Sequence, residues 1–342
     1  MKILVTGGYG FIGSNLIKSL LTNKNYQILN LDKVTETSIP LSLKSVKSKN
    51  YYFYKIDICN YNKLKKIIYE YKPNIIFHLA AETHVDNSIT GPKKFIDTNI
   101  VGTFNLIDIC KNLYARKNYK NFKFIHISTD EVYGSLKKNA KSFTEKSSFK
   151  PNSPYASSKA SSDLLVRAWI KTFKFPAIIT NCSNNYGPWQ YPEKLIPLVI
   201  AKCILKLKIP VYGNGLNERD WLYVGDHVGA LIHISKFGRV GDKYNIGMNR
   251  TLKNINLIKK ICRKLDTLNL HDNKKFKHET LISFVKDRKG HDFKYAVNSA
   301  KLKKLRKFEY EKNFDTTLSE TVLWYIENKK WLIDAYYKKF KR

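Results

Sequence analysis

The chain has 342 residues, 43% of them hydrophobic, which is enough for one large domain or for a large domain with a smaller partner. Apolar runs recur along the whole chain without a fixed period, which excludes a disordered protein, a coiled coil and a solenoid. Lys and Arg outnumber Asp and Glu by 61 to 28, but they are spread over nearly every predicted element, so specific nucleic-acid binding is not expected.

No uninterrupted apolar run is long enough to span a bilayer, and the chain enters a strand at Lys2 without a basic and apolar leader. The five cysteines are widely scattered and never form a CxxC pair, which indicates free thiols in a reducing compartment. We therefore expect a cytoplasmic protein with no membrane partner and no metal.

Short β-rich runs alternate with amphipathic helical patterns in the first half, as in βαβ units with a parallel sheet. In chain order we predict strands at 2–6, 26–31, 51–56, 74–80, 122–128 and 176–182, and helices at 11–23, 61–71, 93–116 and 154–173. Beyond 180 the pattern breaks into a loop, a helix near 193–206, a short strand around Val211, and helices near 226–237, 253–267 and 314–328. The pattern predicts an α/β protein with a Rossmann-type doubly wound sheet over 1–180, joined by one later strand and helix, and a smaller α/β domain over 181–342.

A glycine-rich turn follows the first strand and opens the first helix, over Gly7–Gly13. Glycine allows the tight turn and a close approach to pyrophosphate, while the helix N-terminus attracts the phosphates. Asp32 ends the second strand at the spacing expected of a carboxylate that binds ribose hydroxyls and repels a 2′-phosphate, which favours NAD over NADP. The adjacent Lys33 leaves that choice less certain, and Asp57 is either an adenine contact or an exposed loop acid.

A second motif combines a helical Tyr155–Lys159 pair with Thr129, at the end of a predicted strand. The ammonium, together with a positive nicotinamide, would lower the pKa of the tyrosine so that its phenolate acts as a base near neutral pH. Asp130 and Glu131 directly follow the threonine. Hydride transfer alone has no use for these two carboxyls, whereas elimination of water needs an acid and a base; the alternative is an exposed acidic turn.

With these motifs the chain resembles the extended short-chain dehydrogenases/reductases and, among them, the dTDP-glucose 4,6-dehydratases. The Thr129-Asp130-Glu131 triplet and the Pro192–Pro197 string are specific to the dehydratase branch. The matching segments extend nearly end to end: Thr6–Ser14, His78–Asp86, Thr98–Thr103, Ser128–Gly134, Tyr155–Lys159, Asn184–Pro188, Tyr191–Pro197, Arg219–His227 and Asp287–Asp292.

The resemblance implies an NAD-dependent lyase of deoxysugar synthesis, such as that of rhamnose for cell-surface polysaccharide. Tyr155, helped by Thr129 and Lys159, would take the proton of the sugar 4-hydroxyl while hydride leaves C4 for NAD. Glu131 would then remove the C5 proton and Asp130 would protonate the departing 6-hydroxyl, and hydride return to C6 leaves a 4-keto-6-deoxy sugar. dTDP-glucose is the expected donor; UDP-glucose stays open, and a 4-epimerase is the less favoured alternative because it has no use for the two carboxyls.

The resemblance also assigns the binding residues. Those for NAD are Gly7, Gly10, Phe11, Ile12, Gly13, Asp32, Lys33, Asp57, Ile58, Leu79, Ala80, Ala81, Thr98, Tyr155 and Lys159. Those for the nucleotide sugar are Thr83, Thr129, Asn185, Lys194, Leu195, Pro210, Tyr212, Arg219, Asn254, Arg288 and His291. The guanidinium groups of Arg219 and Arg288 suit a diphosphate, and the alternative for each is a surface salt bridge. His84 is either near the substrate or a structural histidine.

Three departures from the family pattern bear on nucleotide affinity and choice: Val34–Ser38 in place of the usual Tyr-Ala-Gly, Asn87 for arginine and Lys289 for proline. The first leaves the contacts on the adenosine side open. The family forms homodimers through two helices of each subunit, here 93–116 and 154–173, so a homodimer is expected.

Overall fold

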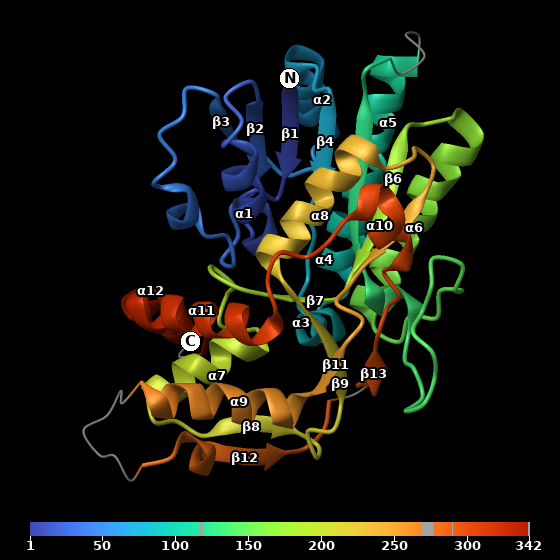
Figure 1. Cartoon of the computed structure of the whole chain (residues 1–342). Helices are drawn as coiled ribbons and strands as arrows, with labels where there is room; N and C mark the ends of the chain where they lie inside the picture. The colour runs from blue at the N-terminus through green and yellow to red at the C-terminus, as the bar shows by residue number, and fades with distance from the viewer. Residues whose placement is uncertain (116–119, 269–275, 289, 341–342) are drawn as a thin grey trace.

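A parallel sheet forms the upper lobe of the molecule (Figure 1). The computed structural model describes residues 1–115, 120–268, 276–288 and 290–340, and within them this sheet has seven strands in the order β10-β6-β5-β4-β1-β2-β3. All neighbouring strands are parallel. The strands are β1 (Lys2–Thr6), β2 (Gln27–Asp32), β3 (Tyr51–Lys55), β4 (Ile75–His78), β5 (Lys123–Thr129), β6 (Ala177–Cys182) and β10 (Lys243–Ile246).

Helices cover both faces of this sheet, which is why its central strands consist of continuous apolar residues. In β1, Ile3 and Val5 belong to the core on one face and Leu4 to the core on the other, as the period of two in a strand requires. The first core contains residues of α1 (Phe11–Leu20) and α8 (Val224–Phe237), and the second contains residues of α2 (Tyr61–Tyr71), α5 (Gly102–Tyr114) and α6 (Pro154–Phe173). The predicted doubly wound fold is confirmed.

The helix predicted over 93–116 is not regular. It consists of a short α4 (Lys93–Phe95), a π-helical segment (Ile96–Val101) and α5, and residue 116 lies outside the described part of the chain. The wider π-helical turn holds Thr98 and Asn99, which are both buried. The Thr98 hydroxyl accepts a hydrogen bond from the Lys33 ammonium, and the Asn99 amide donates one to the Ser158 hydroxyl. Amphipathic spacing does not distinguish such a segment from an α-helix.

The lower lobe is a smaller α/β unit, also as predicted (Figure 1). Its core is built mainly from α7 (Leu195–Ile204), α9 (Asn254–Thr267), α11 (Phe314–Glu327) and α12 (Lys329–Phe340). Its strands are β7 (Asn184–Tyr186), β8 (Ile209–Tyr212), β9 (Glu218–Tyr223), β11 (Thr251–Lys253), β12 (Ile282–Val285) and β13 (Lys294–Tyr295). The short helices α3 (Val85–Thr90) and α10 (Ala300–Lys304) complete the α and β elements. β10 and α8 follow residue 180 in the chain but belong to the upper lobe.

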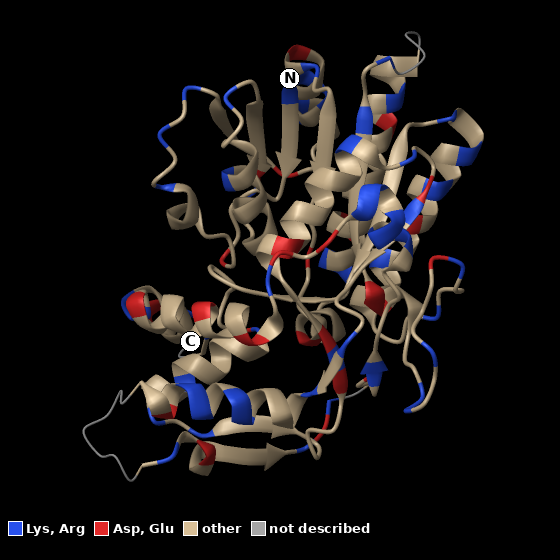
Figure 2. Cartoon of the chain, in the orientation of Figure 1, with Lys and Arg blue, Asp and Glu red and all other residues tan. Residues whose placement is uncertain are grey.

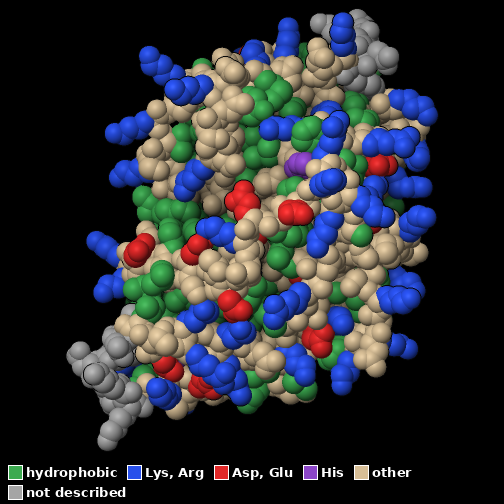
Figure 3. Space-filling view, in the orientation of Figure 1, with side chains coloured by type: hydrophobic (Ala, Val, Ile, Leu, Met, Phe, Trp, Pro, Cys, Tyr) green, Lys and Arg blue, Asp and Glu red, His purple; other side chains and the backbone are tan. Residues whose placement is uncertain are grey.

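The basic residues lie on helices and loops of both lobes (Figure 2), and they are equally dispersed on the face seen in Figure 3. Across the described ranges, no helix is both long and apolar enough to cross a bilayer. In the same ranges, no cluster of three or more His, Cys, Asp or Glu is placed to hold a metal ion.

Candidate active site

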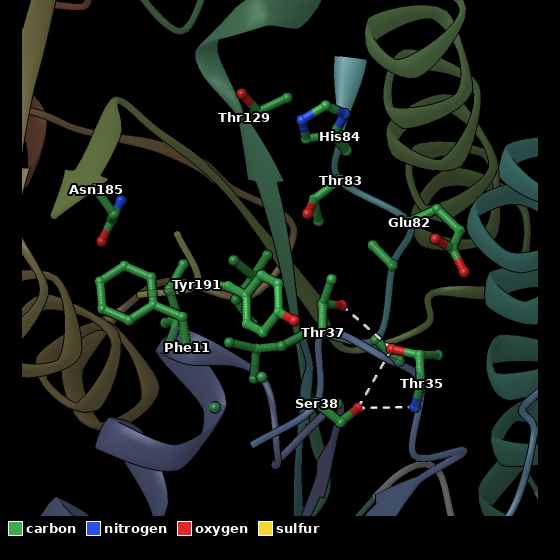
Figure 4. A pocket seen from close by; sticks show the side chains of 18 of the residues that line it. Phe11, Thr35, Thr37, Ser38, Glu82, Thr83, His84, Thr129, Asn185 and Tyr191 are labelled. Carbon is green, nitrogen blue, oxygen red and sulfur yellow. Dashed lines mark hydrogen bonds between the residues drawn. The ribbon is translucent and has the colours of Figure 1, made fainter. Parts of the chain in front are cut away.

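A cavity of about 320 Å³ lies at the carboxyl ends of the parallel strands. Its walls come from the turn after β1, the ends of β2 and β3, the segments after β4 and β5, and residues 182–194. Figure 4 shows the hydroxyls of Thr35, Thr37 and Ser38 near one end and Thr129 with His84 near the other. Ligands of doubly wound sheets bind in this position, where the strand order reverses between β1 and β4.

The glycine turn has room for backbone only. Gly7 has a φ of +73°, and a Cβ there would lie 2.8 Å from the backbone of Ala80. A Cβ on Gly13 would lie 2.3 Å from the Gly7 carbonyl oxygen, so both positions require glycine. α1 begins directly after this turn without a side-chain cap, so its positive end faces the turn. This geometry fits a diphosphate.

Asp32 lies at the end of β2 with an ordered carboxylate. It accepts hydrogen bonds from the Tyr9 and Val34 amides at 3.0 and 2.7 Å and from the Ser38 hydroxyl at 3.1 Å. The adjacent Lys33 ammonium lies 3.0 Å from the Glu82 carboxylate and donates to the Thr98 hydroxyl. Because Lys33 is already paired with an acid, it does not offset the preference of Asp32 for a 2′-hydroxyl over a 2′-phosphate.

Thr129, Tyr155 and Lys159 line the inner part of the cavity. Thr129 ends β5, and the other two lie four residues apart on α6, whose first turn is capped by the Ser153 hydroxyl. Lys159 is buried and donates to the carbonyl of Ile127 at 2.9 Å, which fixes its ammonium behind the strand end.

Among the protein groups alone, burial has the largest effect on the pKa of Tyr155. Burial raises the pKa of Tyr155 well above 10, Glu131 and Cys182 add to the rise, and a hydrogen bond with Thr129 opposes it. Burial also lowers the pKa of Lys159, which the Asp163 carboxylate counteracts. The lowered pKa expected for Tyr155 involves the positive nicotinamide as well as Lys159, and it stays a prediction.

Asp130 and Glu131 form a 3₁₀ turn at the end of β5 and are not an exposed acidic loop. Asp130 is only 2% exposed, and burial, followed by the charges of Glu131 and Asp220, raises its pKa well above 3.8. Burial also raises the pKa of Glu131, but Arg219 and Lys194 oppose that rise. The two neighbouring carboxyls therefore differ: Asp130 is held protonated more strongly, and Glu131, which lines the cavity, ionises more readily.

The basic residues of the lower lobe lie beyond Glu131. Arg219 is 7% exposed, lies over the Tyr295 ring and donates to main-chain carbonyls, so the surface salt bridge considered for it is not found. Arg288 does form an ion pair: its guanidinium lies 2.6 Å from the carboxylate of Asp86 and stacks over Tyr212.

The cavity lining contains most of the residues predicted from the sequence: Gly7, Gly10, Phe11, Ile12, Gly13, Asp32, Lys33, Asp57, Ile58, Leu79, Ala80, Ala81, Thr83, Thr129, Glu131, Tyr155, Lys159, Asn185 and Lys194. Asp130 lies behind it, Thr98 contacts Lys33, and Leu195 begins α7. Pro210 and Tyr212 lie on β8, Asn254 begins α9, and His291 pairs with Asp287 beside Arg288. Lys289 lies outside the described residues.

The lining also includes residues that were not assigned to the binding of NAD or the nucleotide sugar: Thr35, Thr37, Ser38, Glu82, Cys182, Gln190, Tyr191 and Glu193, together with Asn87, noted above as a departure from the family pattern. Glu82 could have been predicted from the sequence, because it follows the carboxyl end of β4, and ligands of parallel sheets bind at the carboxyl ends of the strands. His84 lines the cavity, and its ring accepts from the Asn87 amide at the start of α3, so a structural role is present and proximity to the substrate stays a prediction.

The fold and these side chains define a short-chain dehydrogenase/reductase type of site with an added acid and base. The chain matches the model of the GDP-mannose 4,6 dehydratase family over residues 4–321. It is 45% identical over 335 residues to a dTDP-glucose 4,6-dehydratase of Neisseria meningitidis serogroup B, covering 96% of this chain and 94% of that protein. The chain belongs to this family of nucleotide-sugar 4,6-dehydratases, as its motifs indicated.

Solved structures agree with this family. A dTDP-glucose 4,6-dehydratase of Bacillus anthracis, crystallised in complex with NAD, superposes with a TM-score of 0.86 at 42% identity, covering 98% of this chain and 99% of that one. A UDP-glucose 4-epimerase of Thermotoga maritima also superposes, with a TM-score of 0.83 but only 26% identity, covering 96% and 100% of the two chains. The fold is therefore shared with epimerases, and the residues of the site must distinguish the two reactions.

Proposed function

We propose that this protein is an NAD-dependent hydro-lyase that converts dTDP-glucose into dTDP-4-keto-6-deoxyglucose and water. The observation that carries the proposal is the adjacent pair of carboxyls directly after Thr129, the buried Asp130 and the cavity-lining Glu131, close to Tyr155 and Lys159. An epimerase needs only Thr129, Tyr155 and Lys159. The cofactor is NAD, which fits the glycine turn and the carboxylate of Asp32 described above.

The first half of the reaction uses the inner group of side chains. NAD would be held by the Gly7–Gly13 turn and the Asp32 carboxylate, and it would supply reversible hydride transfer, from C4 of the sugar and back to C6. Tyr155 takes the proton from the 4-hydroxyl, and the Thr129 hydroxyl stabilises its phenolate by a hydrogen bond. Lys159, anchored on the Ile127 carbonyl, supplies positive charge behind the phenolate.

The elimination uses the two carboxyls. The 4-ketone acidifies the C5 proton, and Glu131, the more readily ionised group, removes it. Asp130, held neutral by burial, gives its proton to the departing 6-hydroxyl, so that one water leaves. The elimination thus transfers one proton to Glu131 and one from Asp130 and leaves a C5=C6 double bond conjugated to the ketone. When hydride returns to C6, C5 takes up a proton that originates in solvent. The protein returns to its starting state when the proton on Glu131 restores Asp130 and the proton that Tyr155 took from the 4-hydroxyl leaves to solvent.

The nucleotide and diphosphate are assigned to the residues between the two lobes. Lys194 lies on the cavity wall, where its ammonium donates to the Thr83 carbonyl, and Arg219 lies behind Glu131. Arg288, with Tyr212 and His291, continues this positive region. Two arginines and a lysine suit a diphosphate because their donors match its oxygens.

We further propose that the enzyme is a homodimer. Five large apolar side chains are exposed along the described parts of the helices predicted to form the interface: Ile96 at 50%, Val101 at 42%, Phe104 at 39%, Leu164 at 52% and Phe173 at 40%. Replacing Leu164 by Asp should shift wild-type dimers toward monomers in light scattering, whereas the same change at Lys174, directly after the end of α6, should not. A monomeric wild type would contradict the proposal.

We place the enzyme in the cytoplasm, where its product would enter deoxysugar synthesis, for example that of rhamnose for surface polysaccharide. The support from this chain is its cysteines, none of which forms a disulfide in the described residues, as in proteins of a reducing compartment.

The proposal is tested by incubating the purified protein with dTDP-glucose and with UDP-glucose and identifying the products by mass and NMR. Loss of water and a 4-keto-6-deoxy product, formed faster from dTDP-glucose, is the expected result. Faster conversion of UDP-glucose would correct the donor alone. Formation of the galactose epimer without a change in mass would contradict the dehydratase.

A further inference from the structure

The C-terminal helix α12 lies beyond residue 321, where the match to the family model ends, yet it contacts the active-site segment 187–194. The Lys339 ammonium lies 2.9 Å from the carboxylate of Glu193, whose side chain is only 4% exposed and lines the cavity. In Figure 1, α12 lies at the edge of the lower lobe that faces the upper lobe.

One stripe of α12 follows the active-site segment. Trp331 packs edge-to-face on Trp189 with ring centroids 5.1 Å apart. Ala335 shares a small buried core with Tyr191, and one helical step further Lys339 pairs with Glu193. Residues 331, 335 and 339 are spaced by four and so share one helix face, while 189, 191 and 193 alternate along the segment. The contact is therefore specific and includes two residues of the cavity wall, Tyr191 and Glu193.

A carboxylate on the wall of a diphosphate site needs a reason, because it would repel the ligand. Burial opposes ionisation of Glu193, but Lys194, His84 and Lys339 outweigh it and lower the pKa, so the group is charged. Lys194 follows Glu193 directly and is the residue proposed to bind the diphosphate. Without Lys339, the buried carboxylate would rely on Lys194, the other lysine that lowers its pKa, and would compete with the substrate for it.

We propose that α12 is part of the substrate site and that Lys339 is a positioning residue, which binds Glu193 and leaves Lys194 available to the diphosphate of the nucleotide sugar. The identity of the substrate rests on the proposed function above. Lys339 does not touch the reacting atoms, so its loss should affect binding of the nucleotide sugar and not the chemical steps.

The test compares Lys339→Met, which keeps the length of the stem, with Lys338→Met, an exposed neighbour on the same helix. We expect Lys339→Met to raise KM for dTDP-glucose about tenfold, the effect of losing a charged contact, with kcat changed less than about twofold. Lys338→Met should behave as the wild type. Equal kinetics of the two variants would overturn the inference.

A double-mutant cycle separates this role from a general loss of structure. If Lys339 acts by neutralising Glu193, then adding Glu193→Gln to Lys339→Met should restore KM toward the value of Glu193→Gln alone. Strictly additive effects would overturn the inference. Calorimetric binding of thymidine diphosphate gives the same comparison of variants without turnover. If Lys339→Met alone binds this ligand more weakly, the inference is supported whether or not dTDP-glucose is converted. A failure to convert dTDP-glucose would contradict only the proposed function.

Discussion

Replacing Asp130 by Asn should separate the two halves of the reaction. The side chain is 2% exposed, and burial holds its carboxyl protonated, so the amide is close to the native group in shape and charge. One carboxyl oxygen accepts from the Thr129 hydroxyl, and the variant retains an oxygen for that bond. The oxidation of C4 should therefore proceed, because Tyr155, Thr129 and Lys159 are untouched.

The elimination should slow by about 10²- to 10⁴-fold, the usual contribution of a general acid, which corresponds to about 3 to 5 kcal/mol of activation free energy. Reduced nicotinamide should then accumulate in a single turnover with dTDP-glucose, seen by its near-ultraviolet absorbance, while the 4-keto-6-deoxy product appears slowly. A variant that eliminates water at the native rate, or one that no longer reduces the cofactor, would refute this assignment of Asp130.

The stability of this variant gives an independent check. A carboxyl whose folded-state pKa is raised destabilises the protein increasingly as the pH rises above the unfolded value of 3.8. The amide of Asp130→Asn cannot ionise, so we expect the free energy of unfolding at neutral pH to be equal to or higher than that of the wild type. A strongly destabilised variant would show that Asp130 is ionised and paired in the native state.

Three further predictions concern other parts of the site. Tyr155→Phe should slow the reduction of NAD by dTDP-glucose about 10²-fold or more in stopped-flow absorbance, while binding of the cofactor persists. A rate of NAD reduction equal to that of the wild type would exclude Tyr155 as the base. Asp32→Asn should weaken NAD in equilibrium binding and narrow the preference for NAD over NADP; an unchanged ratio would show that Asp32 does not choose the cofactor. Burial raises the pKa of Asp220 to about 7, so the contribution of this residue to the free energy of unfolding should fall from pH 4 toward pH 7. In urea unfolding, Asp220→Asn should therefore gain stability relative to the wild type over that range, and parallel curves of the two proteins against pH would contradict this.

The upper lobe could be predicted from the sequence because each local signal agrees with the fold. Ile3, Leu4 and Val5 are apolar because both faces of β1 are buried, and the helices show the period of an amphipathic helix. Gly7, Gly13 and Asp32 could be assigned because the turn, the strand end and their spacing all depend on neighbours in the chain. Predicted ends differ from the observed ones by a few residues, as at α1, expected over 11–23 and found over Phe11–Leu20.

The rest depends on residues distant in sequence. β9 pairs with β7, β11 and β13, which are two or three residues long and carry little periodicity of their own. The difference in pKa between the Asp130 and Glu131 carboxyls arises in part from Arg219 and Asp220, which lie on β9 in the other half of the chain. The pKa of Tyr155 follows its burial, which the YxxxK spacing does not reveal.

The central claim is that one site oxidises C4, eliminates water and returns the same hydride to C6. The most direct test supplies dTDP-glucose with deuterium at C4 and locates the label in the product by NMR. We expect the deuterium at C6 of the 4-keto-6-deoxy sugar, with a solvent proton at C5 introduced in exchange for the one that Glu131 removes. Deuterium retained at C4, or lost to solvent, would contradict the account.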